Sequence, residues 1–81
     1  MKDMITVKYF GEIAEAINCN EEKISTKTDK LSELLEQLSD KYNLERFPMI
    51  IALNQNLIEL STDITIKNND ELAILPPFAG G

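Results

Sequence analysis

The chain has 81 residues, 43% of them hydrophobic, and its 14 acidic and 8 basic residues give a formal net charge of −6 at pH 7. This length allows one domain with a thin core and leaves little room for an internal active-site cleft, while the hydrophobic content argues against disorder. The acidic balance excludes a typical nucleic-acid binder, because such proteins need a positive surface to displace the counterions of the phosphate backbone.

The first third of the chain predicts a strand, a short helix and a second strand. In residues 4–10 apolar side chains alternate with polar ones, which is the period of a half-buried strand: Ile5, Thr6, Val7, Lys8, Tyr9. Gly11 is expected to end this strand, and residues 12–17 carry apolar positions at helical spacing. Residues 22–26 are predicted to form the second strand, with Ile24 as its buried residue.

The clearest element is the amphipathic helix predicted for residues 31–42. Its apolar residues recur along one helical face: Leu31, Leu34, Leu35, Leu38 and Tyr42. Thr28 or Asp29 is expected to cap the first turn by accepting a free backbone N–H. Asn43 and then Pro48 are expected to end the helix, since the residue before proline avoids helical backbone angles.

The rest of the chain predicts three more strands, at residues 49–53, 57–60 and 71–75, separated by polar turns. In the last of these strands Leu72 and Ile74 are expected to face the core. The resulting order is that of an α+β fold with one main helix lying across a mixed sheet. The chain contains no internal repeat and no linker, so residues 1–81 are predicted to form a single domain.

The sequence lacks the residues of an ordinary catalytic or metal site. It has no histidine and one cysteine, which excludes histidine-based acid–base chemistry and leaves no zinc ligand set. Gly11 is isolated, so no glycine-rich phosphate loop exists, and Cys19 has no neighbouring base in the sequence that would activate its thiol. We therefore expect no bound cofactor, no metal ion and no catalytic side chain.

The same composition indicates a compartment. A single cysteine cannot form an internal disulfide, which is typical of a reducing environment. No apolar run approaches the roughly 20 residues that span a bilayer, and residues 1–4 carry no apolar core of a signal peptide. We expect a cytoplasmic protein without a membrane partner.

The most informative segment is the last one, Leu75-Pro76-Pro77-Phe78-Ala79-Gly80-Gly81. Proline cannot continue the hydrogen-bonded ladder of a sheet, and two prolines favour a stiff, extended path, so residues 76–81 are predicted to form a tail that points away from the domain. At about 3.3 Å per residue this tail reaches roughly 20 Å. Gly80 and Gly81 lack a Cβ, which makes the tip slim enough to enter a narrow tunnel.

The functional group at this tip is the α-carboxylate of Gly81. A carboxylate is a poor electrophile, but adenylation with ATP gives its carbon a good leaving group. A sulfur nucleophile then produces a thiocarboxylate, whereas a lysine or thiol of a target produces a covalent adduct. Two final glycines arise by chance in about one chain in 200, and the lead-in of a strand followed by Pro76-Pro77 further argues against chance.

Two apolar residues, at the ends of the first and the last predicted strand, do not fall on the core-facing side of the alternation. Phe10 follows Ile5, Val7 and Tyr9 at an odd spacing, and Leu75 falls on the face opposite Leu72 and Ile74. Large apolar side chains on a solvent-facing surface often mark a partner-binding surface. Phe10 and Leu75 are therefore predicted to contact another protein.

Taken along the whole chain, these features resemble the small subunit of molybdopterin synthase, the MoaD family. The resemblance rests on the order of the elements and on three motifs, Leu53-Asn54-Gln55-Asn56, Asn69-Asp70-Glu71-Leu72-Ala73 and, most specifically, Pro76-Pro77-Phe78-Ala79-Gly80-Gly81. It implies the ubiquitin-like β-grasp fold. The family often has a glycine in the turn before Asp70-Glu71, where this chain has Asn68-Asn69, and asparagine tolerates left-handed backbone angles well.

The resemblance also implies a function and partners. An E1-like adenylyltransferase would adenylate Gly81 at the expense of ATP, and a persulfide-carrying enzyme would supply the sulfur of the thiocarboxylate. Residues 76–80 would then insert into the large synthase subunit, where the sulfur passes to cyclic pyranopterin monophosphate to form molybdopterin. Catalytic side chains would belong to the large subunit, within a heterotetramer. Phe10, Leu57 and Leu75 match the hydrophobic contact positions of the family.

Three alternatives remain open at this point. The same tail chemistry would serve a sulfur carrier for thiamine thiazole, cysteine or thiolated tRNA. A ubiquitin-like modifier would join Gly81 to lysines of target proteins. An interaction domain with incidental glycines would function unchanged without Gly80 and Gly81.

Overall fold

The computed structural model describes residues 3–59 and 64–77 of the chain. Its elements follow one another as β1 (Asp3–Tyr9), α1 (Gly11–Ile17), β2 (Glu21–Thr26), α2 (Leu31–Tyr42), the 3-10 helix η1 (Leu44–Arg46), β3 (Ile50–Leu53), β4 (Asn56–Leu57) and β5 (Glu71–Leu75). The predicted positions of Phe78, Ala79, Gly80 and Gly81 lie outside the described residues.

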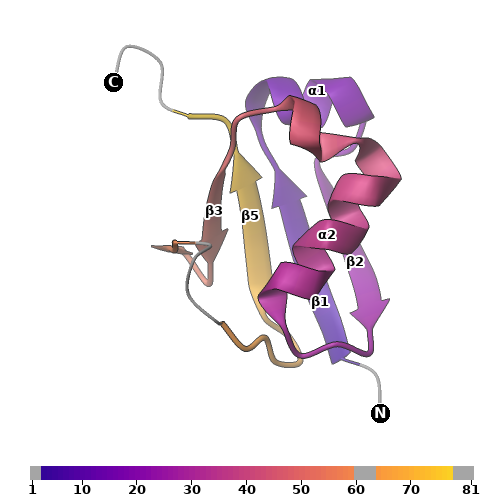
Figure 1. Ribbon diagram of the computed structural model, residues 1–81, viewed down its shortest axis with the longest axis vertical. Coiled ribbons are helices and arrows are strands. Elements are labelled where there is room, and N and C mark those ends of the chain that lie inside the picture. The colour runs from indigo at the N-terminus through magenta and orange to yellow at the C-terminus, as the bar shows by residue number, and fades with distance from the viewer. Residues whose placement is uncertain (1–2, 60–63, 78–81) are drawn as a thin grey trace.

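The strands form one five-stranded sheet in the order β2-β1-β5-β3-β4. β1 and β5 pair in parallel, and the other neighbouring pairs are antiparallel. The α2 helix crosses one face of this sheet in front of β1 and β2, and α1 lies at the end of the sheet toward which β5 runs (Figure 1). This arrangement is the mixed-sheet α+β class, and the ubiquitin-like β-grasp, that the sequence predicts.

The core lies between α2 and the sheet, and the predicted periodicities produce it. One set of alternate residues on β1 and β5 is at most 2% exposed: Ile5, Val7, Tyr9, Leu72 and Ile74. From the helix, Leu31, Leu34 and Leu38 close over them. Each such buried side chain contributes roughly 1.5–3 kcal/mol relative to leaving it in water. Leu35 and Tyr42, predicted for the same stripe, are half-buried at its edge.

The start of α2 differs from the prediction. Its N-cap is Lys30, in extended conformation and without a side-chain cap, rather than Thr28 or Asp29. The N–H of Leu31 is satisfied by the backbone carbonyl of Ile64, at 3.0 Å. The Thr28 hydroxyl accepts from the Lys30 N–H at 3.1 Å and donates to the Glu33 carboxylate at 2.6 Å. The N–H that it binds therefore belongs to the residue just before the helix. A backbone carbonyl distant in the sequence therefore accepts the hydrogen bond that a local side-chain cap would otherwise accept.

Other element boundaries also shift. In β2 the fully buried residue is Thr26, whereas Ile24 is only half-buried at the edge of the core. The return strand predicted for residues 57–60 is shorter and earlier, since β4 spans Asn56–Leu57. The 3-10 helix η1 was not predicted; Asn43 ends α2 in the left-handed conformation (φ 58°), as expected, and Leu44 then fills the core at 1% exposure.

Candidate functional site

The predicted tail begins where the central strand β5 ends. The N–H of Phe10 donates to the carbonyl of Ile74 at 3.1 Å, and Leu75 pairs with Ile50 of β3. Pro76, which follows, has no N–H to continue either ladder, so pairing stops there. Pro76 is half-buried and Pro77 is exposed, so the chain passes from sheet to surface over these two prolines.

The terminal part of the predicted site stays a prediction. Phe78, Ala79 and Gly80, predicted to insert into a partner, and Gly81, predicted to carry the reactive carboxylate, lie outside the residues that the structure describes. What the described residues define is the root of the tail and the surface around it.

The sheet face that turns away from α2 carries an apolar surface next to this root. Cross-strand partners project to the same side of a sheet. Leu75 pairs with Ile50, Ala73 with Ala52, and Ala52 in turn with Leu57. Phe10 extends the same side of β1 beyond Lys8. The outer patch, as we call this surface, consists of Phe10, Ile50, Ala52, Leu57, Ala73 and Leu75.

Exposure in the outer patch agrees in part with the sequence analysis. Leu57 and Phe10 are 64% and 42% exposed, so both side chains are accessible, and their contact with a partner stays a prediction. Leu75 lies on the predicted outer face but is half-buried beside Ile50. Ile50, Ala52 and Ala73 were not predicted for this surface, because their side of the sheet follows from the pairing register, which no local pattern specifies; Ala52 is buried there at 6% exposure.

The outer patch is bordered by charge at the end away from the tail. Lys8 and Glu71 form an ion pair at 3.4 Å on the same face, and Thr6 pairs with Glu71 one step further along. Both charged side chains are about one-third exposed (37% and 34%), so this pair adds little stability. This ion pair separates the outer patch from Met4, an exposed apolar residue at the start of β1.

The two supporting motifs meet in one hydrogen-bonded cluster. The Asn54 side-chain amide donates to Asp70 at 3.0 Å, and its oxygen accepts from the Glu71 N–H at 2.9 Å. Asp70 also accepts from the Lys67 N–H at 2.8 Å. Asn54 and Asn69 have φ of 51° and 72°, the left-handed region that asparagine tolerates. These residues hold the β3–β4 turn against the start of β5, so their role is structural.

A second polar cluster joins β1, β2 and α2. The hydroxyls of Tyr9 and Tyr42 both donate to one carboxylate oxygen of Glu22, at 2.7 and 2.8 Å, and Lys41 lies 3.4 Å from the other oxygen. Burial raises the pKa of Tyr9 well above its usual value, and the bond to Glu22 raises it further. Burial alone would also raise the pKa of Glu22, but the tyrosine hydroxyls and Lys41 lower it overall. Both tyrosine hydroxyls are satisfied by the carboxylate, and the bonds join three elements, so the cluster serves stability.

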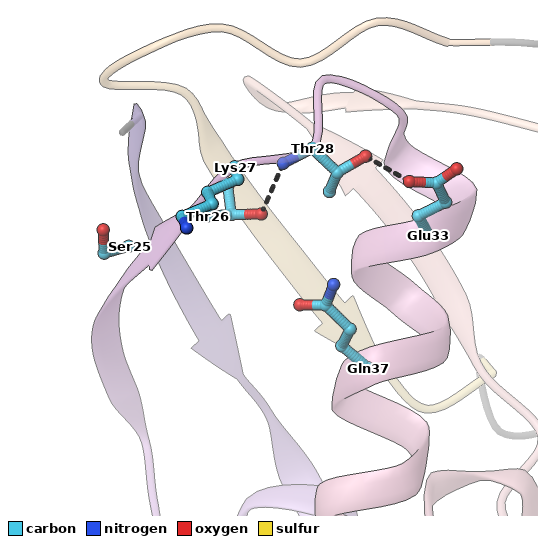
Figure 2. Close-up of a pocket in the computed structure, with 6 residues that line it drawn as sticks. All are labelled: Ser25, Thr26, Lys27, Thr28, Glu33 and Gln37. Atoms are coloured by element: carbon cyan, nitrogen blue, oxygen red, sulfur yellow. Dashed lines mark hydrogen bonds between the residues drawn. The ribbon is translucent and has the colours of Figure 1, made fainter. Parts of the chain in front are cut away.

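A hollow beside α2 offers no alternative site. It has a volume of about 500 Å³ and lies between the end of β2 and α2. Figure 2 shows its lining. The Thr28 hydroxyl donates to Glu33, Ser25 lies near the end of β2, Lys27 directly follows the strand, and Gln37 projects from α2. The hollow is open and polar, and the Thr28 hydroxyl that contacts the Glu33 carboxylate also accepts the Lys30 N–H just before α2, which gives this contact a structural role. Within residues 3–59 and 64–77, no acidic or cysteine side chains are grouped to hold a metal ion.

None of the helices in the described part of the chain is long and apolar enough to cross a membrane. Cys19, the one cysteine, is half-buried, and its thiol lies 3.6 Å from the carbonyl oxygen of Glu21. The described residues thus leave the tail root and the outer patch as the candidate site.

Comparison with known proteins identifies the family of the chain. The profile of the ThiS family matches residues 7–81. A molybdopterin synthase sulfur carrier subunit from Drosophila yakuba is 38% identical over 95% of this chain and 90% of its own length.

Two solved structures extend the comparison. One, a complex of subunits 1 and 2 of the molybdopterin-converting factor from Helicobacter pylori, is similar at 36% identity with a TM-score of 0.68, over 96% of this chain and 99% of the matched chain. The other, small archaeal modifier protein 1 from Methanosarcina acetivorans, has 28% identity and a TM-score of 0.77, over 100% of this chain and 99% of the other. The chain therefore belongs to the ThiS family of ubiquitin-like proteins, alongside the molybdopterin synthase sulfur carrier subunits.

Proposed function

We propose that this chain is the sulfur carrier subunit of a molybdopterin synthase and that the α-carboxylate of Gly81 is its working group. One structural observation supports this function above others: the central strand β5 ends at two prolines beside an apolar surface on which Phe10 and Leu57 are exposed. A carrier needs both parts, a segment that leaves the domain and a face that docks next to it. The 38% identical relative carries the name of this function.

The proposed chemistry takes place in partner enzymes. An E1-like enzyme joins Gly81 to AMP from ATP, releasing pyrophosphate. The terminal sulfur of an enzyme persulfide attacks the carbonyl carbon, a C–S bond forms, and the C–O bond to AMP breaks. A second thiol then cleaves the S–S bond, which leaves a thiocarboxylate on Gly81 and a disulfide on the donor. The chain itself supplies the acyl group and its delivery, with no catalytic side chain of its own.

Delivery of the sulfur would use the outer patch and the tail together. The large synthase subunit would cover Phe10, Leu57 and Leu75, in the heterotetramer that the family resemblance implies, while residues 76–81 enter its active site. There the thiocarboxylate would pass sulfur to cyclic pyranopterin monophosphate, and a second carrier would supply the other sulfur of molybdopterin. Docking beside the tail root would hold the tail near the active site, so the transfer step would become effectively unimolecular.

Mass spectrometry of the intact protein tests the proposal. After incubation with its activating enzyme, ATP and a persulfide donor, the chain should become about 16 Da heavier, since sulfur replaces one oxygen. A variant with one alanine added after Gly81 is the matched control, because it keeps the domain and removes the glycine carboxylate; it should gain no mass. Loading of the extended variant, or a wild-type chain that never gains this mass, would refute the terminal-carboxylate mechanism.

A second function has one observation in its favour. The similarity to a small archaeal modifier protein, at 28% identity across the full chain, is compatible with attachment of Gly81 to lysines of other proteins. The activation step would be the same, and the acceptor would differ. Expression of a tagged chain should separate the two: lysine conjugates that vanish when Gly81 is deleted indicate a modifier, and sulfur transfer to the purified synthase without conjugates indicates a carrier. Carriers for thiamine thiazole, cysteine or thiolated tRNA would be recognised by which acceptor enzyme takes the sulfur.

A further inference from the structure

Gly11 and Pro76 meet at the point where β1 and β5 separate. The two strands run in parallel up to the pair Tyr9 and Ile74, and the last bond between them is the Phe10 N–H to the Ile74 carbonyl, at 3.1 Å. One residue later the two chains diverge: Gly11 begins α1 and Pro76 leaves the sheet. In Figure 1 both α1 and the end of β5 lie at the same end of the molecule.

The contact leaves no room for a side chain on Gly11. A Cβ placed there would lie 2.8 Å from Cγ of Pro76, closer than carbon atoms pack, and 3.4 Å from its Cδ, an ordinary van der Waals contact. Gly11 also has φ of 58°, the left-handed region in which a residue with a Cβ is strained. The proline ring cannot swing aside as a flexible side chain would, because it is closed onto its own backbone.

Of the two residues in this contact, Gly11 is held more firmly by its surroundings than Pro76. Gly11 is fixed between β1 and the first turn of α1, whose Ile13 is fully buried. On the other side Leu75 is fixed by its pairing with Ile50, but Pro76 has no N–H and Pro77 is exposed. Crowding at Gly11 would therefore be relieved by rotation of the chain from Pro76 onward, and the domain would stay in place.

We infer that the absence of a side chain at Gly11 sets the direction in which the tail leaves the domain, which makes Gly11 a positioning residue for sulfur delivery. This inference rests on the proposed carrier function for its consequence, though the contact itself does not depend on it. Gly11 touches no reacting atom and acts through the orientation of Pro76. Misplacement of a reacting group by about 1 Å lowers reaction rates by about 10²-fold, so even a small rotation at the root should matter at the tip.

The test is a double-variant cycle with Gly11→Ala, Pro76→Ala and both together. Alanine at position 76 lacks the Cγ that a new Cβ would meet, so the second substitution removes the clash. With carriers loaded beforehand with thiocarboxylate, Gly11→Ala should lower kcat of sulfur transfer by about tenfold or more, and KM should stay within about twofold because the outer patch is intact. In the Pro76→Ala background the same substitution should lower kcat by less than about threefold.

A structural readout accompanies the kinetics and needs no enzyme. In the wild-type chain, NMR should show a nuclear Overhauser effect between the Gly11 Hα and Pro76 Hγ protons. In Gly11→Ala the Cα–Hα residual dipolar couplings of Pro77 should change while those of β1 and β5 stay the same. Unchanged couplings at Pro77, or an equal loss of kcat in both backgrounds, would overturn the inference.

Two further variants separate positioning from destabilisation. Gly11→Asn places the same Cβ against Pro76 in a residue that accepts left-handed angles, so it should reproduce the loss of kcat with better folding than Gly11→Ala. Asn18→Ala strains the other end of α1, where Asn18 has φ of 56°, without approaching the tail root. It should lower stability and leave kcat unchanged; an equal loss of kcat in Asn18→Ala would overturn the inference. A wild-type carrier that never transfers sulfur would refute the proposed function, whereas the NMR result would still decide the contact.

Discussion

At the scale of single residues, the hydrogen bonds of Asn54 explain why two separate sequence motifs occur together. It donates to Asp70, accepts from the Glu71 N–H, and has φ of 51°. Aspartate could not replace it, because a carboxylate cannot donate to Asp70, and alanine could do neither task. The motif around Asn54 and the one around Asp70 therefore go together because they are two halves of one contact.

Asn54→Ala should destabilise the fold by about 2–3 kcal/mol, since it leaves the Glu71 N–H without its acceptor and places alanine in the left-handed region. Urea denaturation measures this loss, and amide exchange at Glu71 should accelerate. Asn54→Gly removes the same hydrogen bonds without the backbone strain, so it should be less damaging than alanine. A change within about 0.5 kcal/mol for Asn54→Ala would show that the cluster is dispensable.

At the scale of elements, the sheet presents two different faces. α2 covers one with Leu31, Leu34 and Leu38, and the other carries the outer patch at the end where the tail begins. The position of α2 and the core faces of β1, β2 and β5 follow from period alone, so the sequence predicts them. The length of β4 and the capping of α2 were not predicted, because the first depends on pairing with β3 and the second on a carbonyl of Ile64, more than 30 residues away.

Phe10→Asp should weaken binding to the large synthase subunit by about tenfold or more while lowering stability by less than about 1 kcal/mol. The physical reason is that Phe10 is 42% exposed and lies outside the core, so a charge there affects docking more than folding. Isothermal titration calorimetry and urea denaturation of the same samples give the two quantities.

Met4→Asp is the matched control for this substitution. Met4 has the same 42% exposure and lies on the outer face of β1, at the end of the strand away from Phe10 and the tail. Its affinity for the large subunit should remain within about twofold of the wild type. If Phe10→Asp unfolds the chain with affinity per folded molecule intact, the residue belongs to the core instead.

At the scale of the whole molecule, the order of the strands brings the beginning and the end of the described chain together in the centre of the sheet. β1 and β5 are parallel neighbours, and the tail root lies beside the start of α1. The cluster around Glu22 then ties β1 and β2 to α2 through Tyr9 and Tyr42. Its carboxylate thus links three elements across the fold, and its charge state bears on global stability.

Stability should fall in acid partly through Glu22. The pKa of Glu22 is lower in the folded chain than its ordinary value of 4.5, so its contribution is fully present above about pH 4.5 and is lost as the pH falls through the folded-state pKa. Glu22→Gln should be less stable than the wild type by about 1–3 kcal/mol at pH 7, and this difference should shrink below pH 4.5.

Urea denaturation at a series of pH values measures both curves. Glu36→Gln, an exposed position on α2, serves as the control and should follow the wild-type curve. Parallel curves for Glu22→Gln and the wild type between pH 3 and pH 7 would exclude Glu22 as the titrating group.

The sequence by itself determined the periodic features of this protein. Alternation placed Ile5, Val7 and Tyr9 on one side of a strand, helical spacing placed Leu31, Leu34 and Leu38 on one side of a helix, and the lack of histidine left the tail as the functional candidate. These features are local, because each depends only on the geometry of a single element and on which side chains water excludes.

Only the tertiary structure decided which distant residues became neighbours. It set Ile50 beside Leu75 on the outer face, Gly11 against Pro76 at the tail root, and Glu22 within hydrogen-bond distance of two tyrosine hydroxyls. Such neighbours follow from strand order and register, which arise from hydrogen bonds and packing between segments far apart in the chain. A local pattern does not specify those partners, so the contact at Pro76 and the extent of the outer patch could be read only from the folded chain.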